Sequence, residues 1–90
     1  MKFYTVYFED EYACTGRKEL GHFKRYSDAQ KVFERVVNDL LVKREVIGNV
    51  PFRVNSPSKD RFLIHDIIDE FINEPTWEAE VVWIEKHELL

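Results

Sequence analysis

The chain has 90 residues and a mass of 10.8 kDa; 44% of its residues are hydrophobic, 33% are charged, and it holds three Gly and three Pro. This length predicts a single domain, residues 1–90, and the hydrophobic share excludes a disordered tail. The longest aliphatic or aromatic run is four residues, 81–84, so no membrane span is expected. Because Cys14 is the only cysteine and no signal peptide is recognisable, we expect a small cytoplasmic protein of bacterial or phage type.

The net charge of −4 is unevenly distributed along the chain. Residues 1–45 hold nine Lys/Arg and eight Asp/Glu, whereas residues 46–90 hold four and nine. From Asp66 to Glu88 there are eight acids and one base, Lys86. An acidic strip of this kind steers a basic partner toward the surface that carries it, although two oppositely biased solvated faces explain the same pattern.

The first half of the chain predicts a hairpin followed by a helix. Residues 3–8 are aromatic and β-branched, which is typical of a strand, and residues 19–26 are expected to form its weaker return strand. Ser27 is a candidate N-cap with Gln30 three residues later, and apolar side chains then recur at helical spacing to Leu41. Gly48 is expected to end this helix.

The second half predicts a short strand, a second helix and a final strand. Residues 50–54 alternate between apolar and polar, which favours a strand. Residues 57–73 place their apolar side chains on one helical face, from Leu63 to Ile72, but Phe62 falls on the polar side. Residues 76–87 form a strong strand pattern. The predicted fold is therefore α+β, in the order β-β-α-β-α-β, with a mostly antiparallel four-stranded sheet and two helices on one face.

The first and last strands are apolar on both sides, so we expect them to pair in the middle of the sheet. Two helices cover one face only, and the other face would then expose Phe3, Tyr7, Trp77 and Trp83 or their opposite-side counterparts. Contiguous aromatic surface of this kind is typical of protein interfaces, which predicts a homodimer or another protein partner. The alternative is that a segment such as 10–18 or 46–57 folds over this face.

The segment from Arg17 to Tyr26 is the best candidate for ligand binding. Its bases Arg17, Lys18, Lys24 and Arg25 are interleaved with aromatic residues, as on surfaces that bind nucleic acids. The acidic second half of the chain opposes this function, because it repels phosphates. Nucleic-acid binding is therefore the alternative function.

The remaining polar residues do not predict an enzyme or a metal site. Cys14 has no base and orienting group at a spacing known for thiol catalysis, and His22, His65 and His87 lack the paired spacing of zinc ligands. Asp66, Asp69 and Glu70 form an acidic group without an accompanying pocket, so we expect them to contact a basic partner. The sequence thus predicts a non-enzymatic protein-interaction module without cofactor or metal. A small enzyme with a site across a dimer interface is a further alternative.

Overall fold

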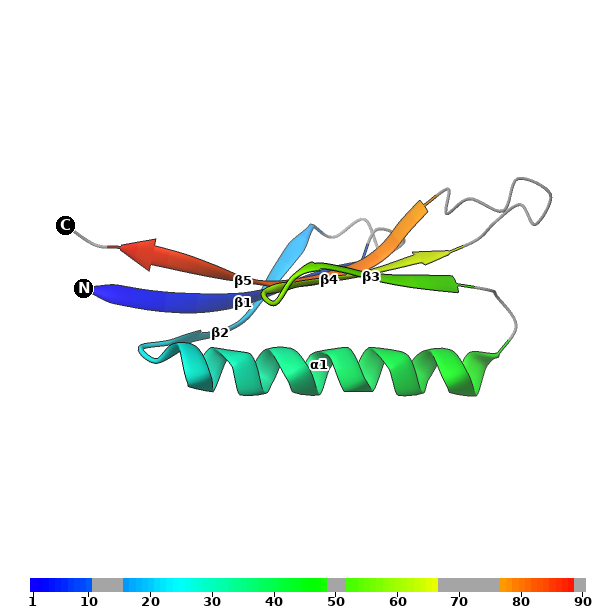
Figure 1. Cartoon of the computed structure of the whole chain (residues 1–90), viewed down its shortest axis with the longest axis horizontal. Helices are drawn as coiled ribbons and strands as arrows, with labels where there is room; N and C mark the ends of the chain where they lie inside the picture. Colours follow the sequence, from blue (N-terminus) through cyan, green and yellow to red (C-terminus); the bar gives the residue numbers. More distant parts are fainter. Residues whose placement is uncertain (11–15, 49–51, 67–76, 89–90) are drawn as a thin grey trace.

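The computed structural model describes residues 1–10, 16–48, 52–66 and 77–88, except for the side chains of residues 47, 66 and 77–79. One helix lies along one face of an antiparallel sheet (Figure 1). The elements in chain order are β1 (Lys2–Asp10), β2 (Arg17–Phe23), α1 (Tyr26–Ile47), β3 (Phe52–Ser58), β4 (Arg61–Asp66) and β5 (Trp77–Glu88).

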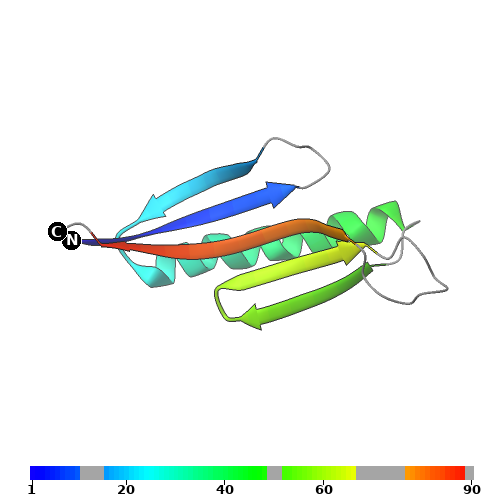
Figure 2. The ribbon, with the colours of Figure 1, turned by 90° about the horizontal axis from the view of Figure 1, so that it is seen from above.

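The sheet has the strand order β2-β1-β5-β4-β3, and each neighbouring pair is antiparallel (Figure 2). The predicted pairing of the first and last strands is confirmed, since β1 and β5 pair from Lys2↔Glu88 to Asp10↔Glu80 in the centre of the sheet. α1 covers one face of these two strands, and on the other face side chains of the two strands pack on each other, as Tyr7 and Trp83 do. Val6 and Tyr7 of β1 point to opposite faces and are both buried.

The predicted second helix and the four-stranded sheet are wrong. The described part of the segment assigned to that helix, residues 57–66, lies in β3, a two-residue turn and β4, so the described residues form five strands and one helix. A short apolar run fits a helix and a buried strand equally well, and here the sheet makes the strand more favourable because Leu63 and Ile64 are buried on opposite faces. Phe62, which did not fit the helical face, packs against the core from the same side as Ile64. The rest of the predicted helix, residues 67–73, lies outside the described residues.

Helix α1 follows the prediction closely, with a difference at its start. It begins at Tyr26, and its N-cap is Arg25 without a side-chain cap bond, so the assignment of Ser27 as N-cap is wrong. Its end is confirmed: Gly48 adopts the left-handed conformation with φ 65°, and its N–H donates to the Arg44 carbonyl at 3.0 Å. A glycine suits this position because it has no Cβ to clash there.

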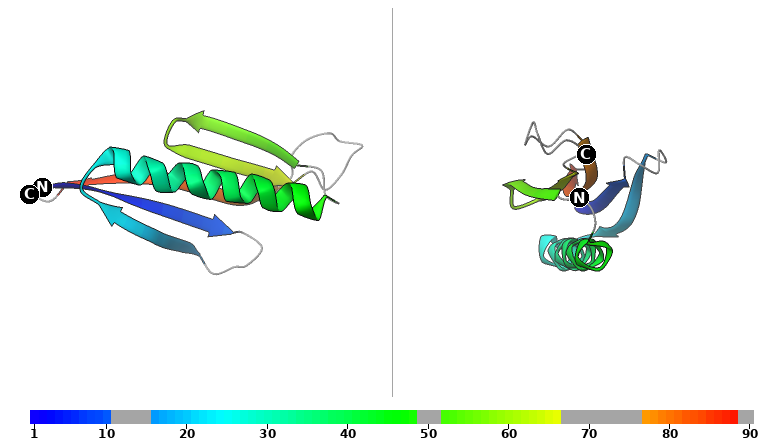
Figure 3. Two further views of the ribbon diagram at one scale, coloured as in Figure 1. Left: turned by 90° about the horizontal axis from the view of Figure 1, so that it is seen from below. Right: turned by 90° about the vertical axis from the view of Figure 1, so that its right-hand side faces the viewer.

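The core lies between α1 and the sheet, which form two layers in the end-on view of Figure 3. α1 contributes Ala29, Phe33 and Leu40, which recur at the spacing of one helical face. The sheet contributes the side chains that face the helix, which are Val6 from β1, Ile64 from β4 and Val82 and Ile84 from β5. Burial of these apolar side chains on one side of the sheet is the main source of stability.

Two polar contacts fix the ends of α1. At its start the Tyr26 hydroxyl donates a hydrogen bond to Asp60 in the β3–β4 turn, which raises the pKa of Tyr26 to about 12. Near its end Arg44 donates to the buried Glu80 of β5, with Nη2–Oε1 and Nε–Oε1 distances of 2.7 Å and 3.0 Å. These contacts attach the helix to the β4 and β5 side of the sheet.

Candidate functional site

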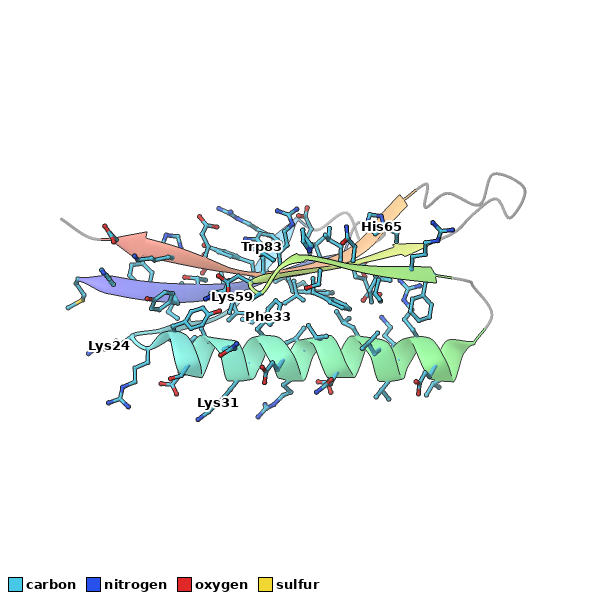
Figure 4. The ribbon with its side chains drawn as sticks, viewed as in Figure 1. Lys24, Lys31, Phe33, Lys59, His65 and Trp83 are labelled. Carbon is cyan, nitrogen blue, oxygen red and sulfur yellow. The ribbon has the colours of Figure 1, made fainter. Side chains whose placement is uncertain are left out.

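The candidate site is the open face of the sheet, which is the face turned away from α1. Side chains alternate along a strand, so Phe3, Thr5 and Tyr7 of β1 lie on the side opposite to the core residue Val6. The register with β5 places Trp83 beside Tyr7 on this face. Figure 4 shows Trp83 and His65 on this side of the sheet, whereas Phe33 points from α1 toward the other side.

Three residues are stacked at the centre of the open face. The rings of Tyr7 and Trp83 lie 5.3 Å apart with an interplanar angle of 25°, and the Arg17 guanidinium from β2 lies 4.7 Å above the Tyr7 ring. Tyr7 is buried beneath its neighbours, while Trp83 is half-buried. The Arg17–Tyr7–Trp83 stack therefore combines a rigid aromatic base with an exposed cation.

Phe3 extends this surface toward the ends of β1 and β5. Its ring stacks on His87 at 4.7 Å and meets His22 edge to face at 5.9 Å. His87 Nε2 in turn lies 3.4 Å from the hydroxyl oxygen of Tyr7. Aromatic and imidazole rings from three strands thus form one continuous surface with the stack.

The ring of His22 is oriented by partners on both of its nitrogens. Its Nε2 lies 3.2 Å from Glu19 Oε2, and its Nδ1 lies 2.8 Å from the hydroxyl of the buried Thr5. A carboxylate only accepts, so Nε2 donates to Glu19, and in the neutral ring Nδ1 accepts from Thr5. Both nitrogens of His22 are therefore engaged in holding the surface, an arrangement suited to a binding residue.

Charges of both signs surround the aromatic residues. Arg17 forms an ion pair with Glu85 at 3.8 Å, and both side chains are about half exposed. The register places Glu19 and Arg61 on either side of the Tyr7–Trp83 pair, each as a direct strand neighbour. Exposed ion pairs of this kind contribute little stability, so they leave these charges available to a partner.

The acidic residues expected to attract a basic partner do not form one surface in the described part of the chain. Glu80 is buried between α1 and the sheet and is paired with Arg44, so it faces away from the open face. Glu85 lies on the open face, and Glu88 pairs with Lys86 at 3.1 Å. The side chains of Asp66, Asp69, Glu70 and Trp77 lie outside the described residues.

The four bases of the predicted nucleic-acid-binding segment lie at opposite ends of β2. Arg17 and Lys18 begin this strand, and Lys24 and Arg25 follow its end, so about 20 Å of strand separates the two pairs. Arg17 alone of the four joins the stack over Tyr7. Figure 4 shows Lys24 beside the start of α1, on the helix side of the molecule.

Sequence reasoning missed His22 and His87 as parts of this surface. Both belong to it because the antiparallel register places His22 beside Thr5 and His87 beside Phe3. The available signal was the spacing within each strand. Phe3 and Tyr7 are an even number of positions apart, as are Trp83 and His87, and such residues share a face of the sheet. Cys14 lies outside the described residues.

The described residues do not contain a group of three or more His, Cys, Asp or Glu side chains that could hold a metal ion. Over the same residues, α1 is not apolar enough to cross a membrane. The comparisons with protein families, with curated proteins and with solved structures found no match to this chain. The function must therefore be argued from the surface itself.

Proposed function

We propose that this protein is a protein-interaction module and that the open face of the sheet binds another protein. The observation that carries the proposal is the Arg17–Tyr7–Trp83 stack at the centre of a sheet face that α1 does not cover. Trp, Tyr and Arg are the three residue types most enriched among the residues that dominate binding energy at protein interfaces. Here they are already held in place by one another, so a partner would order few additional side chains.

The charges around the stack support a protein partner of mixed surface character. Arg17, Arg61, Glu19 and Glu85 place two cations and two anions around the aromatic residues. These four residues form a rim that carries both positive and negative charges. Such a rim complements a protein surface with alternating charges, and it gives no net attraction to a polyanion. We therefore infer a folded partner that places an apolar side chain against Phe3 and Trp83 and pairs with this rim.

The test is to compare the proteins retained by the wild type and by two variants of the stack, Trp83→Ala and Arg17→Ala. Lys43→Ala is the control, because Lys43 is exposed and belongs to α1, which lies on the other face of the sheet (Figure 1). Circular dichroism and a thermal melt establish that each variant is folded. We expect a partner that the wild type and the control retain, that both stack variants lose, and whose binding protects β1 and β5 from hydrogen exchange. Equal recovery by all four proteins would contradict the proposal.

Nucleic-acid binding is the second candidate, and one observation favours it. Phe3, His22, His87 and Arg17 form a platform of rings and cations on an antiparallel sheet, which is a surface on which unpaired bases stack. The measurement is binding of a fluorescent single-stranded oligonucleotide at low and high salt. Affinity that falls steeply with salt and is lost in Trp83→Ala would support this candidate, and no binding at low salt would remove it.

A further inference from the structure

The outward side of α1 carries a stripe of polar residues at seven-residue spacing. Lys31, Asn38 and Glu45 are seven positions apart, so their side chains point in nearly the same direction, with a drift of about 20° per step. All three are exposed. Figure 4 shows Lys31 pointing away from the sheet. Neither Lys31 nor Glu45 forms an ion pair with another residue in the described part of the chain.

A cavity of about 420 Å³ opens next to this stripe, between α1 and the β3–β4 hairpin. Its walls are Phe33, Glu34, Val37 and Asn38 from α1, with Ser56 from β3 and Phe62 from β4. The cavity exists because α1 packs on β1, β5 and β2, so that the hairpin extends to one side of the helix (Figure 3). The walls are mainly apolar, and Asn38 belongs both to the cavity and to the stripe.

Two exposed apolar side chains of α1, Val42 and Val46, lie close to this stripe. Among the described residues the exposed large hydrophobic side chains are Met1, Leu20, Val42, Val46 and Val54. Val42 is 58% exposed and lies nine positions after Phe33, which places it on the side of α1 opposite to the core. Val46 is 81% exposed and lies one turn further along the helix. Both valines would gain from contact with another apolar surface.

The stripe is complementary to itself when two helices run in opposite directions. A twofold axis at Asn38 places Lys31 of one copy against Glu45 of the second copy, and Glu45 of the first against Lys31 of the second. A parallel pair would place Lys31 against Lys31 and Glu45 against Glu45, which is repulsive. The same axis places Val42 of the second copy at the level of Glu34 of the first, on the flank of the stripe that faces away from the cavity.

We propose that this protein forms a homodimer in which the two α1 helices pack antiparallel along the Lys31–Asn38–Glu45 stripe. Two ion pairs between Lys31 and Glu45 set the register, and Val42 of each copy lies along the edge of the other copy's stripe. The contact involves one helix of about 33 Å per copy, so we expect its area to be at the lower end of specific interfaces and the dimer to be weak. Both open sheet faces remain accessible, so the dimer does not depend on the proposed partner binding.

The test is sedimentation equilibrium of the full chain from low micromolar to several hundred micromolar concentration. The wild type is expected to dimerise, while Lys31→Glu and Glu45→Lys each raise the dissociation constant at least about tenfold, because each creates two like-charge contacts. The double variant Lys31→Glu/Glu45→Lys restores the dimer, since both ion pairs re-form with exchanged signs. An equimolar mixture of the two single variants is expected to give a heterodimer by native mass spectrometry.

Two controls separate this interface from other surfaces. Lys43→Glu changes the net charge as much as Lys31→Glu but lies on the other flank of α1, so it should leave the dimer intact. Trp83→Ala on the open face should also leave it intact, although it is expected to abolish partner binding. A monomeric wild type, unchanged dimers in both single reversals, no rescue in the double variant, or loss of the dimer in Trp83→Ala would each overturn the inference.

Discussion

Replacement of Arg44 by methionine is expected to destabilise the fold strongly, because it leaves a buried carboxylate without its counter-ion. Only 12% of the Arg44 side chain and 3% of the Glu80 side chain are exposed, and Glu80 Oε1 accepts hydrogen bonds from both Nε and Nη2 of Arg44. The second oxygen, Oε2, has no hydrogen-bond partner among the described residues. Arg44 is thus the main source of compensation for this buried charge.

The magnitude follows from this burial. Removing one partner of a buried ion pair typically destabilises a protein by about 3–5 kcal/mol, because the remaining charge is desolvated without compensation. A domain of this size has a total stability of about 5–15 kcal/mol, so Arg44→Met is expected to lower the melting temperature by more than about 12 °C. The double variant Arg44→Met/Glu80→Leu removes both charges, and we expect it to recover most of the loss.

Urea unfolding of the wild type, both single variants and the double variant gives the coupling free energy between the two side chains. Lys86→Met is the control, because the Lys86–Glu88 pair has a similar separation of 3.1 Å but is exposed, and its loss should change stability little. If Arg44→Met and the double variant are equally destabilised, the loss arises from helix packing and the reasoning about the stranded carboxylate is wrong.

Three further predictions concern other contacts of α1. The hydrogen bond from Tyr26 to Asp60 raises the pKa of Tyr26 from 10.0 to about 12, so its contribution to stability is present below pH 10 and is lost as the pH rises to 12. Urea unfolding between pH 8 and 12 should therefore show a steeper loss in the wild type than in Tyr26→Phe. Gly48→Ala should destabilise the protein by about 1 kcal/mol in the same assay, because alanine is strained at φ 65°; an unchanged midpoint would contradict this. Phe33→Ala should destabilise it by about 3–5 kcal/mol, and a loss below 1 kcal/mol would show that the adjoining cavity collapses onto the gap.

Local signals were sufficient for α1 and for the two central strands. The apolar residues from Ala29 to Leu40 recur at a spacing that only a helix brings to one face, and Gly48 ends it through its own backbone preference. In β1 and β5, aromatic and β-branched residues on both sides of the strand indicated a central position, and the register confirms it. These elements carry their structural signal within one segment of the chain.

Local signals failed for residues 57–66 because their pattern fits two structures. Leu63 and Ile64 are adjacent, which suits the buried side of a helix as well as a strand buried on both faces. Phe62 was the one residue that favoured the strand, since it shares a face with Ile64 only there. Pairing with β5 favours the strand, because β5 provides backbone hydrogen-bond partners for β4 that an isolated segment lacks.

The candidate site was predicted in part. Phe3, Tyr7 and Trp83 were assigned to one sheet face from their spacing, and the structure places them together. The contribution of His22 and the position of Arg17 above Tyr7 depend on how β2 pairs with β1, which the sequence pattern does not specify. The acidic residues of β5 do not share one surface, and this too depends on tertiary contacts. Glu80 is turned toward Arg44 of α1 and is buried there.

By itself the sequence determined the helix that ends at Gly48, two strands apolar on both sides, and an uneven charge distribution. Those properties depend on residue type and on spacing within a segment. Only the tertiary structure decided that residues 61–66 form a strand, which face each aromatic side chain occupies, and which charges are buried. These features depend on contacts between segments far apart in the chain. Strands pair through backbone N–H and C=O groups, which nearly all residues carry, so the residue types alone do not specify which strands pair.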